Sequence, residues 1–97
     1  GSNKSYVDLE RIRKVNGLVY YWMLRDYLEP LPEGQMSIKV YAKVDCKTMR
    51  QMPLSVSPYR LPMAKGDAII TGTPPPEWDY AHPDSVNETV LNAVCAH

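Results

Sequence analysis

Residues 38–46 of the 97-residue chain read IKVYAKVDC, and this stretch decides the fold. Apolar residues occupy every second position from Ile38 to Val44, and mostly polar residues stand between them. Because side chains alternate between the two faces of a β-strand, the stretch predicts a strand with one buried face and one polar face. Cys46 shares the parity of the apolar residues, so we expect its sulfur on the buried face.

The last part of the chain has the pattern of an amphipathic helix. Ser85 and Glu88 form the Ser-x-x-Glu capping pattern, and Asp84 is an alternative cap. Apolar residues then follow at helical spacing and form one stripe: Val86, Val90, Leu91, Val94 and Cys95. The pattern therefore predicts a C-terminal helix that directs Cys95 toward the sheet.

Both cysteines point into the same layer between sheet and helix, which is the geometric condition for a disulfide. We predict a Cys46–Cys95 bond, which in the chain-entropy model would stabilise the fold by roughly 4 kcal/mol. The alternative is two buried free thiols, because Cys is among the most buried residue types. A disulfide would indicate a protein from outside the cytoplasm.

A hairpin is expected before this strand. Residues 6–15 alternate loosely, with Val7, Leu9 and Arg11 on one side. Asn16-Gly17 suits the two positive φ angles of a type I′ turn, so we expect the strand over 6–15 to pair with a strand over 18–24.

The strand over 18–24 reads LVYYWML and is apolar on both faces, as in a central strand that is covered twice. A helix covers only one face, so the other is expected to meet further strands or a partner subunit. A filled core is the simpler interpretation. The alternative is a homodimer or partner surface formed by these residues: Tyr20, Tyr21, Trp22 and Met23.

Two further strands are expected after residue 46. Residues 49–59 place Arg50, Met52, Leu54 and Val56 on one parity, while Pro53 and Pro58 favour an edge position or bulges. A short strand over 67–71 precedes Gly72-Thr73-Pro74-Pro75-Pro76. These prolines favour a stiff connector, and a polyproline II docking segment is the alternative.

Together these elements predict an α+β fold with an antiparallel sheet of four to six strands. One C-terminal α-helix packs on one face of the sheet and is tied to it by the disulfide. The length suits a single domain over residues 1–97, in which Gly1-Ser2 is expected to be a cleavage scar. Eleven basic residues balance eleven acidic ones, which argues against nucleic-acid binding, and no apolar run approaches the ~20 residues of a transmembrane helix.

The sequence lacks the residue clusters that catalysis or metal binding requires. His82 is the only histidine inside the chain, and the cysteines lie about fifty residues apart. We therefore expect no catalytic residues, no metal and no cofactor. The alternative is a periplasmic enzyme or enzyme inhibitor with a pocket between sheet and helix, near Trp78, Tyr80 and His82.

Several motifs occur in an order that covers nearly the whole chain. They are Tyr6-Val7-Asp8 leading to Ile12-Arg13, Trp22-x-Leu24-x-Asp26-Tyr27, Lys43-Val44-Asp45-Cys46, and Trp78-x-Tyr80-x-x-Pro83-x-Ser85 followed by Val94-Cys95. In this order and spacing the chain resembles the surface-adhesin protein E family of Gram-negative bacteria.

The resemblance implies an extracytoplasmic protein of the periplasm, outer membrane or secreted fraction, with a lipid anchor in many precursors. Family members of known role bind host proteins such as vitronectin and laminin, and the best-known one dimerises through its sheets. The resemblance thus implies a non-catalytic interaction module with a protein partner. On the polar face of the strand over 38–46, we expect Lys39, Tyr41 and Lys43 to offer a contact surface, and a solvated sheet face is the alternative.

Overall fold

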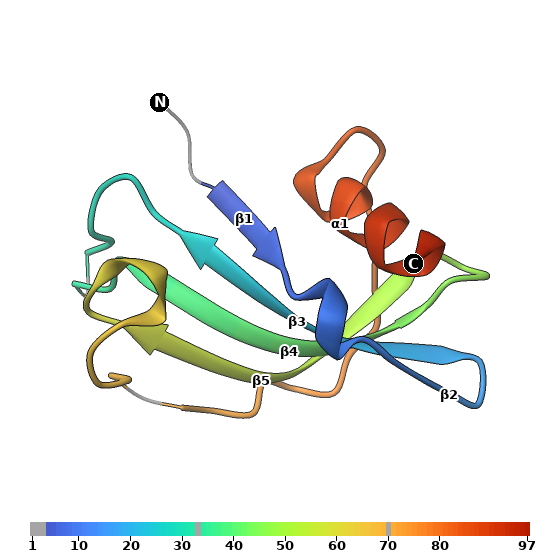
Figure 1. The fold of residues 1–97 in the computed structure, drawn as a ribbon, viewed down its shortest axis with the longest axis horizontal. Coiled ribbons are helices and arrows are strands. Elements are labelled where there is room, and N and C mark those ends of the chain that lie inside the picture. The colour runs from blue at the N-terminus through green and yellow to red at the C-terminus, as the bar shows by residue number, and fades with distance from the viewer. Residues whose placement is uncertain (1–3, 33, 70) are drawn as a thin grey trace.

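The fold is a curled antiparallel sheet with one helix on it (Figure 1). The computed structural model describes residues 4–32, 34–69 and 71–97. In chain order its elements are β1 (Lys4–Val7), the 3₁₀ helix η1 (Leu9–Arg11), β2 (Arg13–Val15), β3 (Leu18–Asp26), β4 (Ser37–Asp45), β5 (Arg50–Tyr59), the 3₁₀ helix η2 (Pro62–Ala64), β6 (Asp79–Tyr80) and α1 (Val86–Ala96).

The strand β3 lies in the interior of the sheet and pairs along one edge with both β1 and β2 and along the other with β4. The remaining order is β4, β5 and β6, and every pairing is antiparallel. Asn16 and Gly17 join β2 to β3 with φ angles of 51° and 82°, which confirms the predicted turn with two positive φ values.

The N-terminal segment contains two short strands where one strand over 6–15 was predicted, so that prediction is wrong in its length. The Asp8 side chain accepts a hydrogen bond from the backbone N–H of Glu10 at 3.1 Å and starts the 3₁₀ turn of η1. This local bond competes with strand pairing. Leu9 consequently lies on the surface, 41% exposed, and does not share the buried face with Val7.

The hydrophobic core lies between one face of the sheet and α1. The core residues are Val19, Tyr21, Ala42, Val44, Val90, Leu91 and Val94. Ser85 caps the helix as predicted, because its Oγ accepts the backbone N–H of Glu88 at 3.1 Å. The Glu88 carboxylate in turn accepts the N–H of Asp84, and Val86, predicted in the buried stripe, is 58% exposed at the first turn.

A β-bulge divides β5 into two halves with opposite side-chain parity. Ala42 pairs with Pro53 while Tyr41 pairs with Ser55, which leaves Leu54 as the extra residue. A bulge near Pro53 confirms one of the two predicted roles of the prolines. We predicted that Arg50, Met52, Leu54 and Val56 share one face of the strand, and this is wrong. Val56 lies on the face of the sheet that carries α1, and Arg50 lies on the opposite face.

The segment after β5 forms isolated bridges where a strand over 67–71 was predicted. Ala68 bridges to Tyr59 and Gly72 to Val56, and residue 70 lies outside the described residues. Pro58 lacks an N–H, so it only accepts, from Ile69 at 2.8 Å, and a continuous ladder is interrupted there.

Candidate functional site

One face of the sheet lies opposite α1, and we call it the open face. The register of β3 and β4 decides which residues it carries: Trp22 pairs with Tyr41, and Tyr20 pairs with Lys43. These residues have the parity opposite to Tyr21 and Ala42, which lie in the core. We define the open-face surface by five residues predicted from the sequence: Tyr20, Trp22, Lys39, Tyr41 and Lys43.

The aromatic side chains of the open-face surface contact one another. The rings of Trp22 and Tyr41 have centroids 4.6 Å apart, and those of Tyr20 and Tyr41 are 6.2 Å apart. The Lys39 ammonium lies 4.8 Å from the centroid of the Trp22 ring, within the range of a cation–π interaction. The structure therefore brings these four residues together in one cluster across two strands.

A second cluster, built around Trp78, lies at one end of this face. The Arg50 guanidinium carbon is 4.4 Å and the Lys43 ammonium 5.5 Å from a Trp78 ring centroid. Arg50 also forms an ion pair with Asp45 at 3.7 Å. These contacts hold the end of the proline-rich segment against the sheet, which supports its interpretation as a connector.

Sequence reasoning did not include Arg50 and Trp78 in the surface. The sequence pattern placed Arg50 on the same face of its strand as Met52. Only the pairing of β5 with β4 shows that this face lies beside Lys43. Trp78 follows three prolines and has no periodic pattern around it, so no local signal indicated its position.

The opposite end of the open face is closed by η2. The Ser37 hydroxyl donates to the Leu61 carbonyl at 2.6 Å and accepts from the Ala64 N–H at 2.9 Å, and Ser37 is fully buried. Asp26 accepts the N–H of Met63 at 2.9 Å. The aromatic and cationic side chains thus lie between two fixed boundaries.

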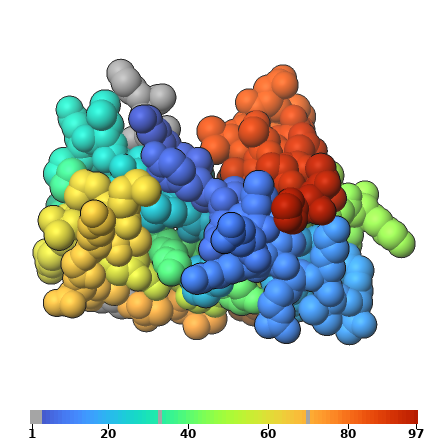
Figure 2. Space-filling model, viewed as in Figure 1, coloured from blue at the N-terminus to red at the C-terminus, as the bar shows by residue number. Residues whose placement is uncertain are grey.

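A notch of about 240 Å³ adjoins the cluster where β1 runs into η1. Tyr6, Trp22 and Leu24 contribute apolar walls. Arg11 and Lys39 contribute cationic groups, and Asp8 contributes a carboxylate that pairs with Arg11. Figure 2 shows the atoms of β3 and β4, in teal and green, lying deeper between the blue η1 segment and the yellow η2 segment. This face is therefore hollowed.

Tyr21 and Met23, which the sequence placed with the partner surface, lie on the other face of β3. Tyr21 is 1% exposed, and its hydroxyl donates to Gln51 Oε1 at 2.7 Å. Met23 packs partly buried against the same core. Tyr21 has no exposed area for a partner, so we correct the prediction by leaving it out of the open-face surface. Met23 has the same parity but is only partly buried, and it lines the notch beside the cluster.

Burial also changes the acidity of Tyr21. Removal of the phenol from water raises its pKa from 10.0 to about 12, because the ionised form loses its hydration. This tyrosine is therefore a neutral core residue at physiological pH.

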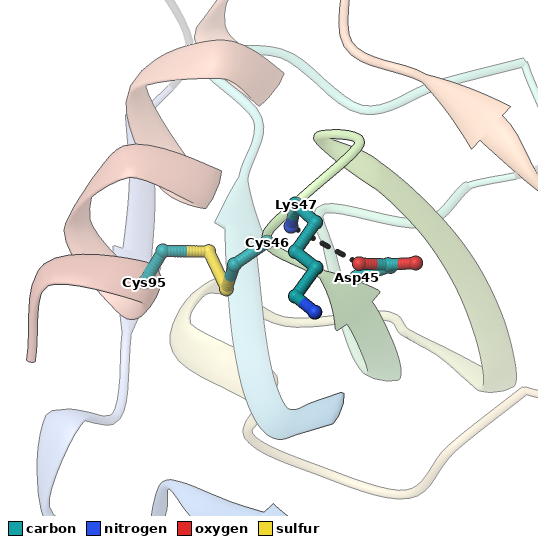
Figure 3. Close-up of a disulfide and its surroundings, with 4 residues drawn as sticks. All are labelled: Asp45, Cys46, Lys47 and Cys95. Carbon is teal, nitrogen blue, oxygen red and sulfur yellow. Dashed lines mark hydrogen bonds between the residues drawn. A yellow bond between two sulfur atoms is a disulfide. The ribbon is translucent and has the colours of Figure 1, made fainter. Parts of the chain in front are cut away.

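The predicted disulfide joins Cys46, directly after β4, to Cys95 in the last turn of α1, with Cα atoms 5.8 Å apart (Figure 3). Asp45 accepts the N–H of Lys47 at 3.0 Å and holds the turn that carries Cys46. The bond confirms that helix and sheet are tied together. It fixes α1 on one face of the sheet.

The structure separates the residues of the alternative enzymatic pocket. Tyr80 is 64% exposed. Neither the notch nor three other cavities, beside Val86, Pro58 and Met36, are lined by Trp78, Tyr80 or His82. The backbone carbonyl of His82 accepts from the Ser85 hydroxyl at 2.7 Å, so this residue belongs to the turn before the helix. Within residues 4–32, 34–69 and 71–97, no three His, Cys, Asp or Glu side chains come together as a metal site.

Comparison with known proteins adds an independent finding. A family model described as Surface-adhesin protein E matches residues 1–96. The chain belongs to the surface-adhesin protein E family. No curated protein sequence matches the chain.

Solved structures of Haemophilus influenzae protein E share the fold. A selenomethionine form has a TM-score of 0.70 at 18% identity, covering 95% of this chain and 78% of that one. A structure of protein E from non-typeable Haemophilus influenzae has a TM-score of 0.63 at 18% identity, and the match covers 95% of this chain and 69% of that one. At this identity the likeness establishes the fold, and the family match establishes an adhesin-like protein.

Membership in this surface-adhesin family supports a location outside the cytoplasm, in agreement with the disulfide. Across the described part of the chain, we find no helix with the length and apolar character that a bilayer crossing demands.

Proposed function

We propose that this protein is a non-catalytic interaction module that binds a protein partner through the open-face surface. The observation that carries the proposal is the cluster of Lys39, Trp22, Tyr41 and Tyr20, which lies on the face opposite α1. Aromatic residues with a polar or charged rim are enriched where proteins bind one another. The family match supports an adhesive role.

The arrangement suits binding because its side chains are already fixed in position. Each ring in the cluster contacts another ring or a cation, and η2 and Trp78 fix the two ends of the face. Side chains that are ordered before binding lose less conformational entropy when a partner arrives.

The test is a binding screen with immobilised oxidised protein against purified matrix and serum proteins, including vitronectin and laminin, and envelope proteins of the source organism. The Lys39→Glu/Lys43→Glu variant should bind the identified partner at least about tenfold more weakly, because it replaces attraction with repulsion. Lys14→Glu is the matched control, since Lys14 is exposed on β2 and pairs with Val19 on the helix side.

Equal binding by all three proteins would contradict the proposal, as would the absence of any partner in the screen. A homodimer through the open face is the alternative occupant of this surface. Light scattering of the oxidised protein tests it: a monomer is expected, and a dimer that Tyr41→Glu converts to a monomer would show that a second copy covers the open face.

A further inference from the structure

The notch beside the aromatic cluster is small. Its volume of about 240 Å³ lies below the ~300–1,000 Å³ of pockets that hold drug-sized ligands. Tyr6, Trp22 and Leu24 give it apolar walls, which favour an apolar group. An apolar side chain that projects from a larger partner fits these properties better than a free small molecule.

The charges around the notch favour an anionic partner. Among the residues that the structure describes, neither Lys39 nor Lys43 forms an ion pair, whereas Arg11 pairs with Asp8 at 3.4 Å and Arg50 with Asp45. Lys39 and Lys43 are four residues apart on one face of β4, or about 13 Å at the usual rise per residue. Two uncompensated positive charges thus flank the aromatic cluster.

The aromatic rings themselves are poorly placed to stack on a sugar or a nucleobase. The Trp22 ring already contacts the Lys39 ammonium at 4.8 Å and the Tyr41 ring at 4.6 Å, and Trp78 contacts Arg50. A stacking ligand would have to displace these contacts. Ring edges carry partial positive charge, so they are compatible with carboxylates beside the cluster.

We propose that the open face recognises an acidic segment of its protein partner. One apolar side chain of that segment enters the notch, and its carboxylates pair with Lys39 at the notch and with Lys43 further along β4. This inference rests on the proposed function and specifies the chemistry of the partner. It adds Tyr6 and Leu24 to the contact residues as the walls that receive the apolar side chain.

The test is a selection from a random peptide library displayed on phage, against the oxidised wild-type protein and with counter-selection on Lys39→Glu/Lys43→Glu. The expected enriched peptides carry an apolar residue together with two or more Asp or Glu residues. A synthetic peptide of the enriched sequence should bind the wild type at least about tenfold more tightly than Lys39→Glu, and more weakly as salt rises.

Three further variants separate the parts of the proposal. Lys39→Met keeps the aliphatic stem and should lose most of the affinity that charge supplies, and Lys14→Glu should bind like the wild type. Tyr6→Ala should weaken the selected peptide and leave a peptide with Ser in place of the apolar residue unchanged. Circular dichroism checks that each variant is folded.

Other outcomes overturn the inference in distinguishable ways. Selected peptides without acidic residues that still depend on Tyr41 would contradict the acidic ligand and leave the proposed function intact. A short heparin fragment that binds with the same Lys39 dependence, while no acidic peptide is enriched, would replace the peptide with a sulfated glycan. If no peptide is enriched, the inference fails, and the partner screen then decides the proposed function separately.

Discussion

Tyr21 shows how one residue serves the core of this molecule. It occupies the centre of β3, it is fully buried under α1, and its hydroxyl donates to Gln51 on β5. Tyr20 and Trp22, its chain neighbours, point to the open face because a strand alternates its side chains. Consecutive residues of one strand therefore divide between the core and the open face.

The raised pKa of Tyr21 predicts a loss of stability at alkaline pH. The pKa of Tyr21 is about 12 in the folded protein and 10.0 in the unfolded chain. The stability that follows from this difference is therefore complete below pH 10 and is lost as pH rises toward 12. The difference corresponds to about 3 kcal/mol at most. Urea unfolding near neutrality and at about pH 11 measures the loss, which Tyr21→Phe should reduce.

Tyr80→Phe is the matched control, because Tyr80 is 64% exposed and its variant should keep the alkaline loss of the wild type. Near neutrality, Tyr21→Phe should itself cost about 1 kcal/mol through the lost hydrogen bond to Gln51. The same alkaline loss in both variants would contradict the assignment to Tyr21.

The turn between β2 and β3 gives a second prediction at this scale. Gly17 has φ of +82°, and a Cβ added there would meet no atom within 4 Å. Gly17→Ala should therefore destabilise the fold by about 1–2 kcal/mol through backbone conformation alone. Gly72 also has open space but lacks a positive φ, so Gly72→Ala should change the free energy of unfolding much less. Equal effects of the two variants in urea unfolding would contradict this account.

At the scale of elements, α1 depends on one buried stripe. Leu91 is fully buried, while Val86 at the first turn is 58% exposed. Leu91→Ala should cost about 2–5 kcal/mol because it opens a cavity against the sheet, and Val86→Ala should stay within about 0.5 kcal/mol. Thermal and urea unfolding of the two variants measure the difference. Comparable losses would mean that the helix packs on another face.

The elements that could be predicted are those whose local pattern agrees with their tertiary role. The alternation in β4, Asn16-Gly17 and the Ser85 cap each indicate one local structure, and the fold uses all three. The 3₁₀ turn after Asp8 was missed because a side chain to backbone bond interrupts an alternating pattern.

The bulge at Leu54 shows a different limit of local patterns. Its position depends on how β5 registers against β4, and no pattern within β5 alone defines that register. The residues of the candidate site were likewise predictable only where one strand's own pattern places them. Lys39, Tyr41 and Lys43 could be predicted from the parity of one strand, whereas Arg50 and Trp78 join them through contacts between segments distant in sequence.

At the scale of the whole molecule, one face of the sheet carries α1 and the core, and our proposal assigns binding to the other face. The disulfide joins residues 49 positions apart and fixes α1 over the core. The Cys46→Ser/Cys95→Ser variant should lose about 4 kcal/mol of unfolding free energy, because the unfolded chain regains the entropy of an open loop. Wild-type protein in reductant should lose a similar amount. A variant as stable as the oxidised wild type would contradict this role.

The most direct test of the account is a peptide map of the protein after denaturation without reductant, alkylation of free thiols and digestion with trypsin. Cleavage after Lys43, Lys47 and Lys65 releases one cysteine in residues 44–47 and the other in residues 66–97. The account predicts one species with the mass of both peptides joined by a disulfide, which separates into two on reduction. Two separate peptides, each alkylated on its cysteine, would show that the helix is not tied to the sheet and would contradict the account.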